Sequence, residues 1–108
     1  MTTFDDREKA FEAKYEHDEQ LKFKVNSRRN KLLGLWAASL MGKTGADAEA
    51  YAKDVVMADF EKPGDSDVVH KLMTDLAAAG KPTDEHAIRK ESHRLADEAK
   101  QQIMSEVR

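Results

Sequence analysis

The 108-residue chain contains no cysteine, only two prolines and few aromatic residues. The absence of cysteine excludes disulfide bonds, thiolate catalysis and cysteine-ligated zinc. With 6% aromatic residues, there is little material for the core of a large β-sandwich. No apolar run approaches the ~18 residues that a membrane-spanning helix needs. The first residues are too charged for a secretory signal, and we therefore expect a cytoplasmic protein that does not insert into a membrane.

Charged residues are abundant and unevenly distributed. Residues 1–20 carry a net charge of −4, from seven acids and three bases, whereas residues 21–43 carry +6 and no acid. Residues 44–108 return to −5, from fourteen acids and nine bases. The basic block has two interpretations: it is the polar face of a helix paired with acids elsewhere in the fold, or it is an anion-binding surface.

Glycine and proline divide the chain into segments with helical periodicity. The breaks occur at Gly42, Pro63-Gly64 and Gly80-Lys81-Pro82. Gly42 and Gly80 directly follow apolar-periodic runs, where the end of a helix favours a residue with positive φ. No segment alternates apolar and polar residues as a strand does. The sequence predicts an all-α protein, most economically a four-helix bundle. The expected helices cover about residues 20–41, 45–61, 66–79 and 84–106.

The first helical segment is too long for such a bundle. Its apolar positions form one stripe at helical spacing: Phe4, Phe11, Tyr15, Leu21, Val25, Leu32, Leu33, Trp36 and Leu40. One helix over residues 4–41 would be about 57 Å long, against about 21–34 Å for the others. We predict a long first helix whose N-terminal part, residues 1–19, forms a projecting or mobile arm, while residues 20–108 form the bundle. The alternative is that the aromatic residues of the arm fold back onto the bundle as ordinary core.

The arm is suited to binding a partner. Isolated helices of this length are marginal in water, so such a segment can become ordered in a groove on another protein. Asp18 interrupts the apolar stripe and marks the expected boundary between arm and bundle. Trp36 lies in the middle of the stripe, and we expect it to be buried.

Three stretches of sequence are similar to a known family. They are FDDREKAFEAKY at residues 4–15, LKFK at residues 21–24 and RRNKLLGLWAA at residues 28–38. They closely resemble the zeta subunit of alphaproteobacterial ATP synthase, and the match continues through the later breaks. The resemblance implies a four-helix bundle and a natural inhibitor of the rotary ATPase, not an enzyme. In that family the N-terminal arm enters an interface between α and β subunits of the catalytic head and blocks rotation of the central stalk in the hydrolytic direction.

The resemblance also implies which residues contact the partner. Aromatic rings of the arm would fill apolar grooves, and its cations would meet acidic side chains. These implied contacts are Phe4, Arg7, Phe11, Lys14 and Tyr15. From the basic block, the residues expected to attract the partner electrostatically are Lys22, Lys24 and Arg28. The implied partners are the α, β and central stalk subunits of the ATP synthase, and the implied location is cytoplasmic, peripheral to the inner-membrane enzyme.

Other functions are weaker alternatives. Residues 41–44 (MGKT) resemble the end of a phosphate-binding P-loop, but Ala37 stands where the pattern requires glycine and no strand precedes it. We expect no cofactor, and weak nucleotide binding near this loop stays open. The histidine spacing makes no ligand set, so no metal is expected. The main alternative is a helical adaptor or a nucleic-acid-binding protein that uses the basic Lys22–Lys31 segment, although the overall acidity argues against nucleic acid.

Overall fold

The computed structural model describes the backbone of residues 3–61 and 65–106, and the side chains of residues 8–60 and 67–106. Within these ranges the chain forms five α-helices and no strand, which confirms the all-α prediction. The helices are α1 (Thr3–His17), α2 (Glu19–Leu40), α3 (Gly45–Glu61), α4 (Asp65–Ala78) and α5 (Glu85–Glu106). The predicted break at Pro63-Gly64 lies outside the described residues.

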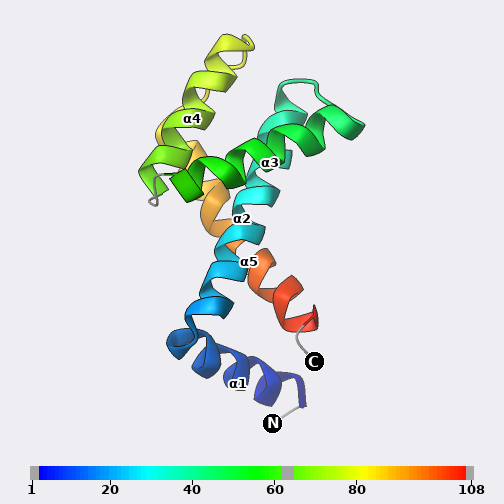
Figure 1. The fold of residues 1–108 in the computed structure, drawn as a ribbon, viewed down its shortest axis with the longest axis vertical. Helices are drawn as coiled ribbons and strands as arrows, with labels where there is room; N and C mark the ends of the chain where they lie inside the picture. The colour runs from blue at the N-terminus through cyan, green and yellow to red at the C-terminus, as the bar shows by residue number, and fades with distance from the viewer. Residues whose placement is uncertain (1–2, 62–64, 107–108) are drawn as a thin grey trace.

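The single long first helix predicted from the sequence is wrong. The segment is divided at Asp18, whose backbone is extended (φ −107°, ψ 104°) and whose carboxylate accepts a hydrogen bond from the Leu21 amide at 3.1 Å. Aspartate caps a helix in this way by satisfying an amide that has no carbonyl partner in the first turn. The chain therefore leaves α1 and begins α2 in a new direction (Figure 1). A short α1 and four further helices replace the expected four-helix bundle with a long first helix.

Helices α2 and α4 end in the same way. Gly42 and Gly80 have positive φ angles of 79° and 77°. The residue after each glycine donates its amide to a carbonyl in the last turn of the preceding helix, in both cases at 2.9 Å. These bonds form Schellman caps, which need a positive φ that glycine adopts without steric cost. The prediction that helices end at these two glycines is confirmed.

Helix α2 is the central element and contacts each of the other four helices. Helix α5 lies beside it along the long axis of the molecule, which measures 48 × 26 × 25 Å (Figure 1). Helices α3 and α4 lie toward one end, and α1 lies across the other end (Figure 1). Helix α3 crosses α2 at Gly34, where a Cβ atom would lie 2.7 Å from the Ala52 Cα atom. The missing side chain of Gly34 therefore sets how closely these two helices approach.

The buried side chains form two clusters along α2. The larger cluster, which we call the main core, joins α2 to α3, α4 and α5. Its members are Leu33, Ala37, Ala38, Tyr51, Val55, Val68, Val69, Leu72, Leu76, Ile88 and Leu95. The smaller cluster, which we call the lower core, joins α1 to the N-terminal half of α2 and to the C-terminal half of α5. Its members are Phe11, Leu21, Val25, Ala99 and Ile103.

Trp36 is not the fully buried anchor that its position in the stripe predicted. Its side chain is partly exposed and packs against the edge of the main core. Leu40, which follows it in the stripe, is 40% exposed. Helix α3 crosses α2 near Gly34, so the small residues Gly34, Ala37 and Ala38 occupy the buried face instead. The tryptophan is thereby displaced to the boundary with solvent.

Candidate partner-binding arm

Helix α1 contains the five side chains that the sequence assigned to partner contacts. Phe4 and Arg7 lie within the helix, but their side chains are outside the described ones. Phe11 is only 7% exposed and belongs to the lower core. Tyr15 is partly buried against the same cluster, and Lys14 is exposed to solvent. The arm thus lies against the molecule through Phe11 and Tyr15, whereas Lys14 is exposed to solvent.

Helix α5 contacts the arm through Lys100, in addition to the apolar contacts of the lower core. The Lys100 ammonium lies 4.6 Å from the centre of the Tyr15 ring and 3.7 Å from the Glu12 carboxylate. The rings of Phe11 and Tyr15 stack along α1, with centroids 6.3 Å apart. Lys100 therefore contacts both the aromatic face of α1 and an acid beside that face.

Within the described part of α1, residues 8–17, Phe11 is the only buried side chain, and Tyr15 is half-buried against the same cluster. Burying one phenylalanine contributes about 1.5–3 kcal/mol. The partly exposed ion pair contributes about 0–1 kcal/mol, and the cation–π contact about 0.5–1 kcal/mol. Because ordering the helix costs free energy as well, these described contacts hold α1 less firmly than the side chains of the main core hold α2 to α5 together.

This arrangement is the alternative in which the aromatic residues of the arm fold back. Helix α1 does not project as a continuation of α2 but lies against α2 and α5. Pattern and length predicted that the apolar stripe continues through Tyr15. Neither the pattern nor the length indicates the angle between α1 and α2. That angle is set at Asp18, which caps α2 with an extended backbone. The division of the chain into a functional arm and a bundle stays a prediction.

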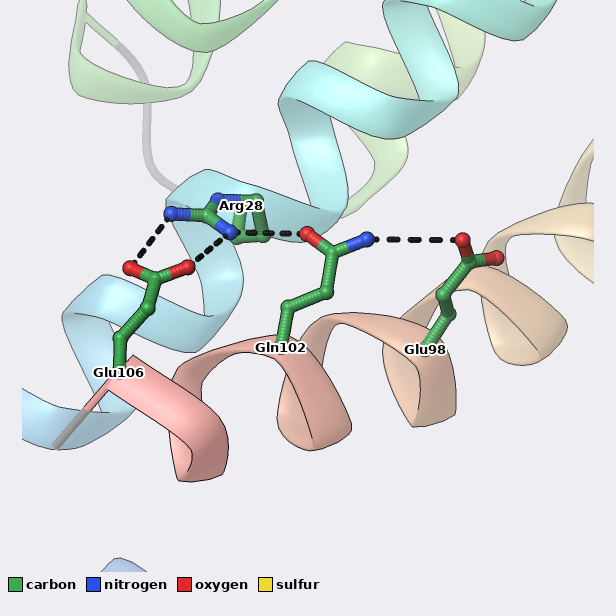
Figure 2. A network of polar contacts seen from close by, with 4 residues as sticks. All are labelled: Arg28, Glu98, Gln102 and Glu106. Atoms are coloured by element: carbon green, nitrogen blue, oxygen red, sulfur yellow. Dashed lines mark hydrogen bonds and ion pairs between the residues drawn. The ribbon is translucent and has the colours of Figure 1, made fainter. Parts of the chain in front are cut away.

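The three basic residues assigned to docking lie in different surroundings. Arg28 donates two hydrogen bonds to the Glu106 carboxylate, at 2.6 and 2.9 Å, and one to the Gln102 amide oxygen at 2.8 Å. Figure 2 shows Arg28 of α2 reaching across to these side chains on α5. Lys22 lies 3.6 Å from Glu19 within α2, and Lys24 is exposed. Arg28 therefore joins two helices, whereas Lys24 points into solvent.

The pKa of Glu106 reflects this ion pair. The hydrogen bond from Arg28 lowers the pKa of the Glu106 carboxyl, and the positive charges of Lys24 and Lys31 lower it further. The same hydrogen bond raises the pKa of Arg28. Of the two interpretations of the basic block, the paired helix face applies to Arg28.

A surface that the sequence did not indicate lies between α2 and α3. The rings of Phe23 and Phe60 are in contact, with centroids 5.2 Å apart, yet the two residues are 53% and 45% exposed. Phe23 is in the LKFK stretch and in the basic Lys22–Lys31 segment, where it was considered only as a residue on which a nucleic-acid base could stack; its contact with Phe60 was not expected. Phe60 lies in the last turn of α3, where the periodic pattern does not distinguish a core residue from an exposed one. Only the packing of the two helices brings these rings together.

Residues 41–44 do not form a phosphate-binding loop. The amide of Gly42 is bonded to the Ser39 carbonyl and that of Lys43 to the Ala38 carbonyl. A P-loop instead directs such amides at the phosphates. Among the described residues, no group of three or more histidine, aspartate or glutamate side chains could hold a metal ion. None of the described helices has both the length and the apolar character needed to cross a bilayer.

Comparisons with known proteins identify the family. No curated protein matches the chain. A protein whose solution NMR structure has been determined is 44% identical in sequence, with a TM-score of 0.70. The match covers 81% of this chain and 99% of that chain. The sequence profile of the family described as ATPase inhibitor subunit zeta matches residues 1–102. The chain therefore belongs to the ATPase inhibitor subunit zeta family.

Proposed function

We propose that this protein inhibits ATP hydrolysis by the rotary ATP synthase, by inserting α1 into an α/β interface of the catalytic head so that the central stalk is blocked. Membership of the zeta family supports an inhibitory, non-catalytic role and an association with the ATP synthase. The proposed location is the cytoplasmic face of the inner membrane. The proposed partners are the α, β and central stalk subunits.

The weak attachment of α1 is the observation that carries this mechanism. Helix α1 is divided from α2 at Asp18 and contributes one buried side chain to the lower core. Of the side chains that the structure describes in α1, residues 8–17, none belongs to the main core. The helix can therefore leave its place while α2 to α5 stay folded, and it would then present Phe11 and Tyr15 to a partner.

Insertion in this mechanism exchanges one set of contacts for another. The ring of Phe11 leaves the lower core and enters an apolar groove of the head, and Lys14 meets an acidic side chain there. Phe4 and Arg7 extend the same contact surface, as the resemblance of residues 4–15 implies. Because α1 must leave the lower core before it binds, the apparent affinity for the head is the intrinsic affinity multiplied by the fraction of molecules in which α1 is released.

The mechanism is tested by deleting residues 1–18. Because the main core is intact in this variant, we expect a cooperative melting transition close to that of the full chain. We expect no inhibition of ATP hydrolysis by the cognate enzyme at any concentration that inhibits with the full chain. Full inhibition by the truncated form would place the active surface on α2 to α5. Loss of folding would show that α1 is an obligatory part of the core, and the mechanism would be wrong.

Point variants refine this test. We expect Phe11→Ala and Tyr15→Ala each to weaken inhibition by about 1–3 kcal/mol, as truncated aromatic residues often do at interfaces. The matched control is Glu16→Ala, because Glu16 is exposed on the same helix. The readout is the concentration that halves the hydrolysis rate. Equal potency of all three variants would remove the aromatic face of α1 from the mechanism.

A further inference from the structure

A shallow groove adjoins the exposed pair of phenylalanine rings. It has a volume of about 580 Å³, and helices α2, α3 and α5 all contribute to it. Phe23 and Val56 supply apolar surface, and Lys24, Arg28 and Lys31 supply positive charge. Its acidic residue, Glu106, is already paired with Arg28. The groove therefore offers apolar contact inside a cationic rim.

Two of the cations are available to a partner. Lys24 and Lys31 are exposed, and their positive charges act on Glu106, whose hydrogen bonds come from Arg28. Arg28, in contrast, is fixed by Glu106 and Gln102. A cationic rim with exposed lysines attracts a negatively charged ligand over long range and accelerates its association.

The aromatic pair gives the same surface a rigid apolar centre. The two rings are held against each other from two different helices, so little side-chain entropy is lost when a partner covers them. Aromatic residues are enriched at the buried centres of protein interfaces, and charged residues are found at the rims. The Phe23–Phe60 pair, with the exposed lysines of the groove beside it, has the same arrangement of an aromatic centre and a charged rim.

We infer that the groove and the Phe23–Phe60 pair bind an acidic protein segment with an apolar side chain, located on the catalytic head of the ATP synthase. This second contact rests on the proposed function and would hold the bundle to the head while α1 occupies the α/β interface. A protein segment is favoured over nucleic acid, because the chain belongs to a family of ATPase inhibitor subunits, whose partner is a protein.

Charge reversal in the full chain tests the cationic rim. We expect Lys24→Glu with Lys31→Glu to weaken binding to the purified head about tenfold at low salt, and less at high salt. The matched control is Lys53→Glu with Lys90→Glu, which makes the same charge change at exposed lysines outside the groove. We expect the control to bind within about twofold of the natural protein. Equal effects of the two double variants would overturn the inference.

Removal of the rings tests the apolar centre. We expect Phe23→Ala with Phe60→Ala to weaken binding about tenfold at every salt concentration. The matched control is Leu40→Ala, an exposed apolar residue at the other end of α2. Melting curves show whether each variant is folded. If the ring variant does not fold, the charge variants described above still test the inference. Unchanged binding of a folded ring variant would overturn the inference.

Two further outcomes would also overturn it. One is self-association of the natural chain in sedimentation that the groove variants abolish, since the occupant would then be a second copy. The other is salt-dependent binding of duplex DNA lost in the same variants. Failure of the proposed function looks different: a chain that binds the head through the groove without slowing hydrolysis would leave this inference standing and remove the inhibitory role of α1.

Discussion

The main core and the lower core are built from similar side chains but are closed in different ways. Four helices contribute to the main core, and its largest members, such as Leu72 and Leu76, are completely inaccessible to solvent. Among the described side chains of α1, Phe11 is the one buried in the lower core, and Tyr15 and Lys100 support it at the edge. A core shared among four helices cannot lose one of them without collapse. A core closed by one ring can open. The same chain therefore combines a stable scaffold with a helix that can be released.

The largest expected effect lies in the main core. We expect Leu72→Ala to lower the free energy of unfolding by about 2–5 kcal/mol, because it leaves a cavity among four helices. The measurement is chemical denaturation, with Leu40→Ala as the control because Leu40 is 40% exposed. Similar losses in the two variants would mean that the main core does not dominate stability.

A somewhat smaller effect is expected where α2 and α3 cross. Gly34→Ala places a methyl group where the Ala52 backbone lies 2.7 Å away. We expect the free energy of unfolding to fall by about 1–3 kcal/mol through overpacking, despite the better helix propensity of alanine. The denaturation midpoint tests this directly. An unchanged or higher midpoint would show that the two helices can separate at little cost.

In the lower core, we expect Phe11→Ala to act locally. The variant loses about 1.5–3 kcal/mol of apolar burial, which releases α1 but leaves the main core intact. Amide hydrogen exchange should therefore accelerate in α1 and stay unchanged around Leu33 and Ala37. Glu16→Ala is the control. Equal acceleration in both regions would show that the molecule opens as one unit and that the distinction between the two cores is wrong.

These expectations also show how far the sequence alone could go. Periodicity and turn residues predicted an all-α chain, and α2 to α5 begin and end within one residue of the expected segments. Asp18 was expected as a boundary, but the long first helix was wrong because periodicity reports the phase of apolar residues and not the direction of the chain. One capping interaction, which contributes about 0.5–2 kcal/mol, divides the helix.

The candidate site was less predictable than the fold. The arm residues came from the resemblance, whereas the burial of Phe11 against Ala99 and Ile103 depends on contacts between the two ends of the chain. The contact of Phe23 with Phe60 likewise depends on how α2 and α3 cross. Such long-range contacts leave no periodic signal within either segment.

The smallest expected effect concerns the ion pair between α2 and the end of α5. The pKa of Glu106 is lowered in the folded state, so its contribution to stability is present above the ordinary pKa of about 4.3 and is lost as the pH falls through the lowered value. We expect Glu106→Gln to melt slightly below the natural protein at pH 7, with the difference disappearing in acid. A difference that persists in acid would assign the effect to packing rather than charge.

The release of α1 is tested most directly by preventing it. Because the chain has no cysteine, Glu12→Cys with Lys100→Cys introduces two unique thiols at a contact between α1 and α5. A short thiol-reactive crosslinker then ties α1 in place, and each single-cysteine variant treated with the same reagent is the control. We expect the untreated double variant and the treated controls to inhibit ATP hydrolysis by the cognate enzyme, and the crosslinked protein to lose inhibition. Full inhibition by the crosslinked protein would contradict the release of α1.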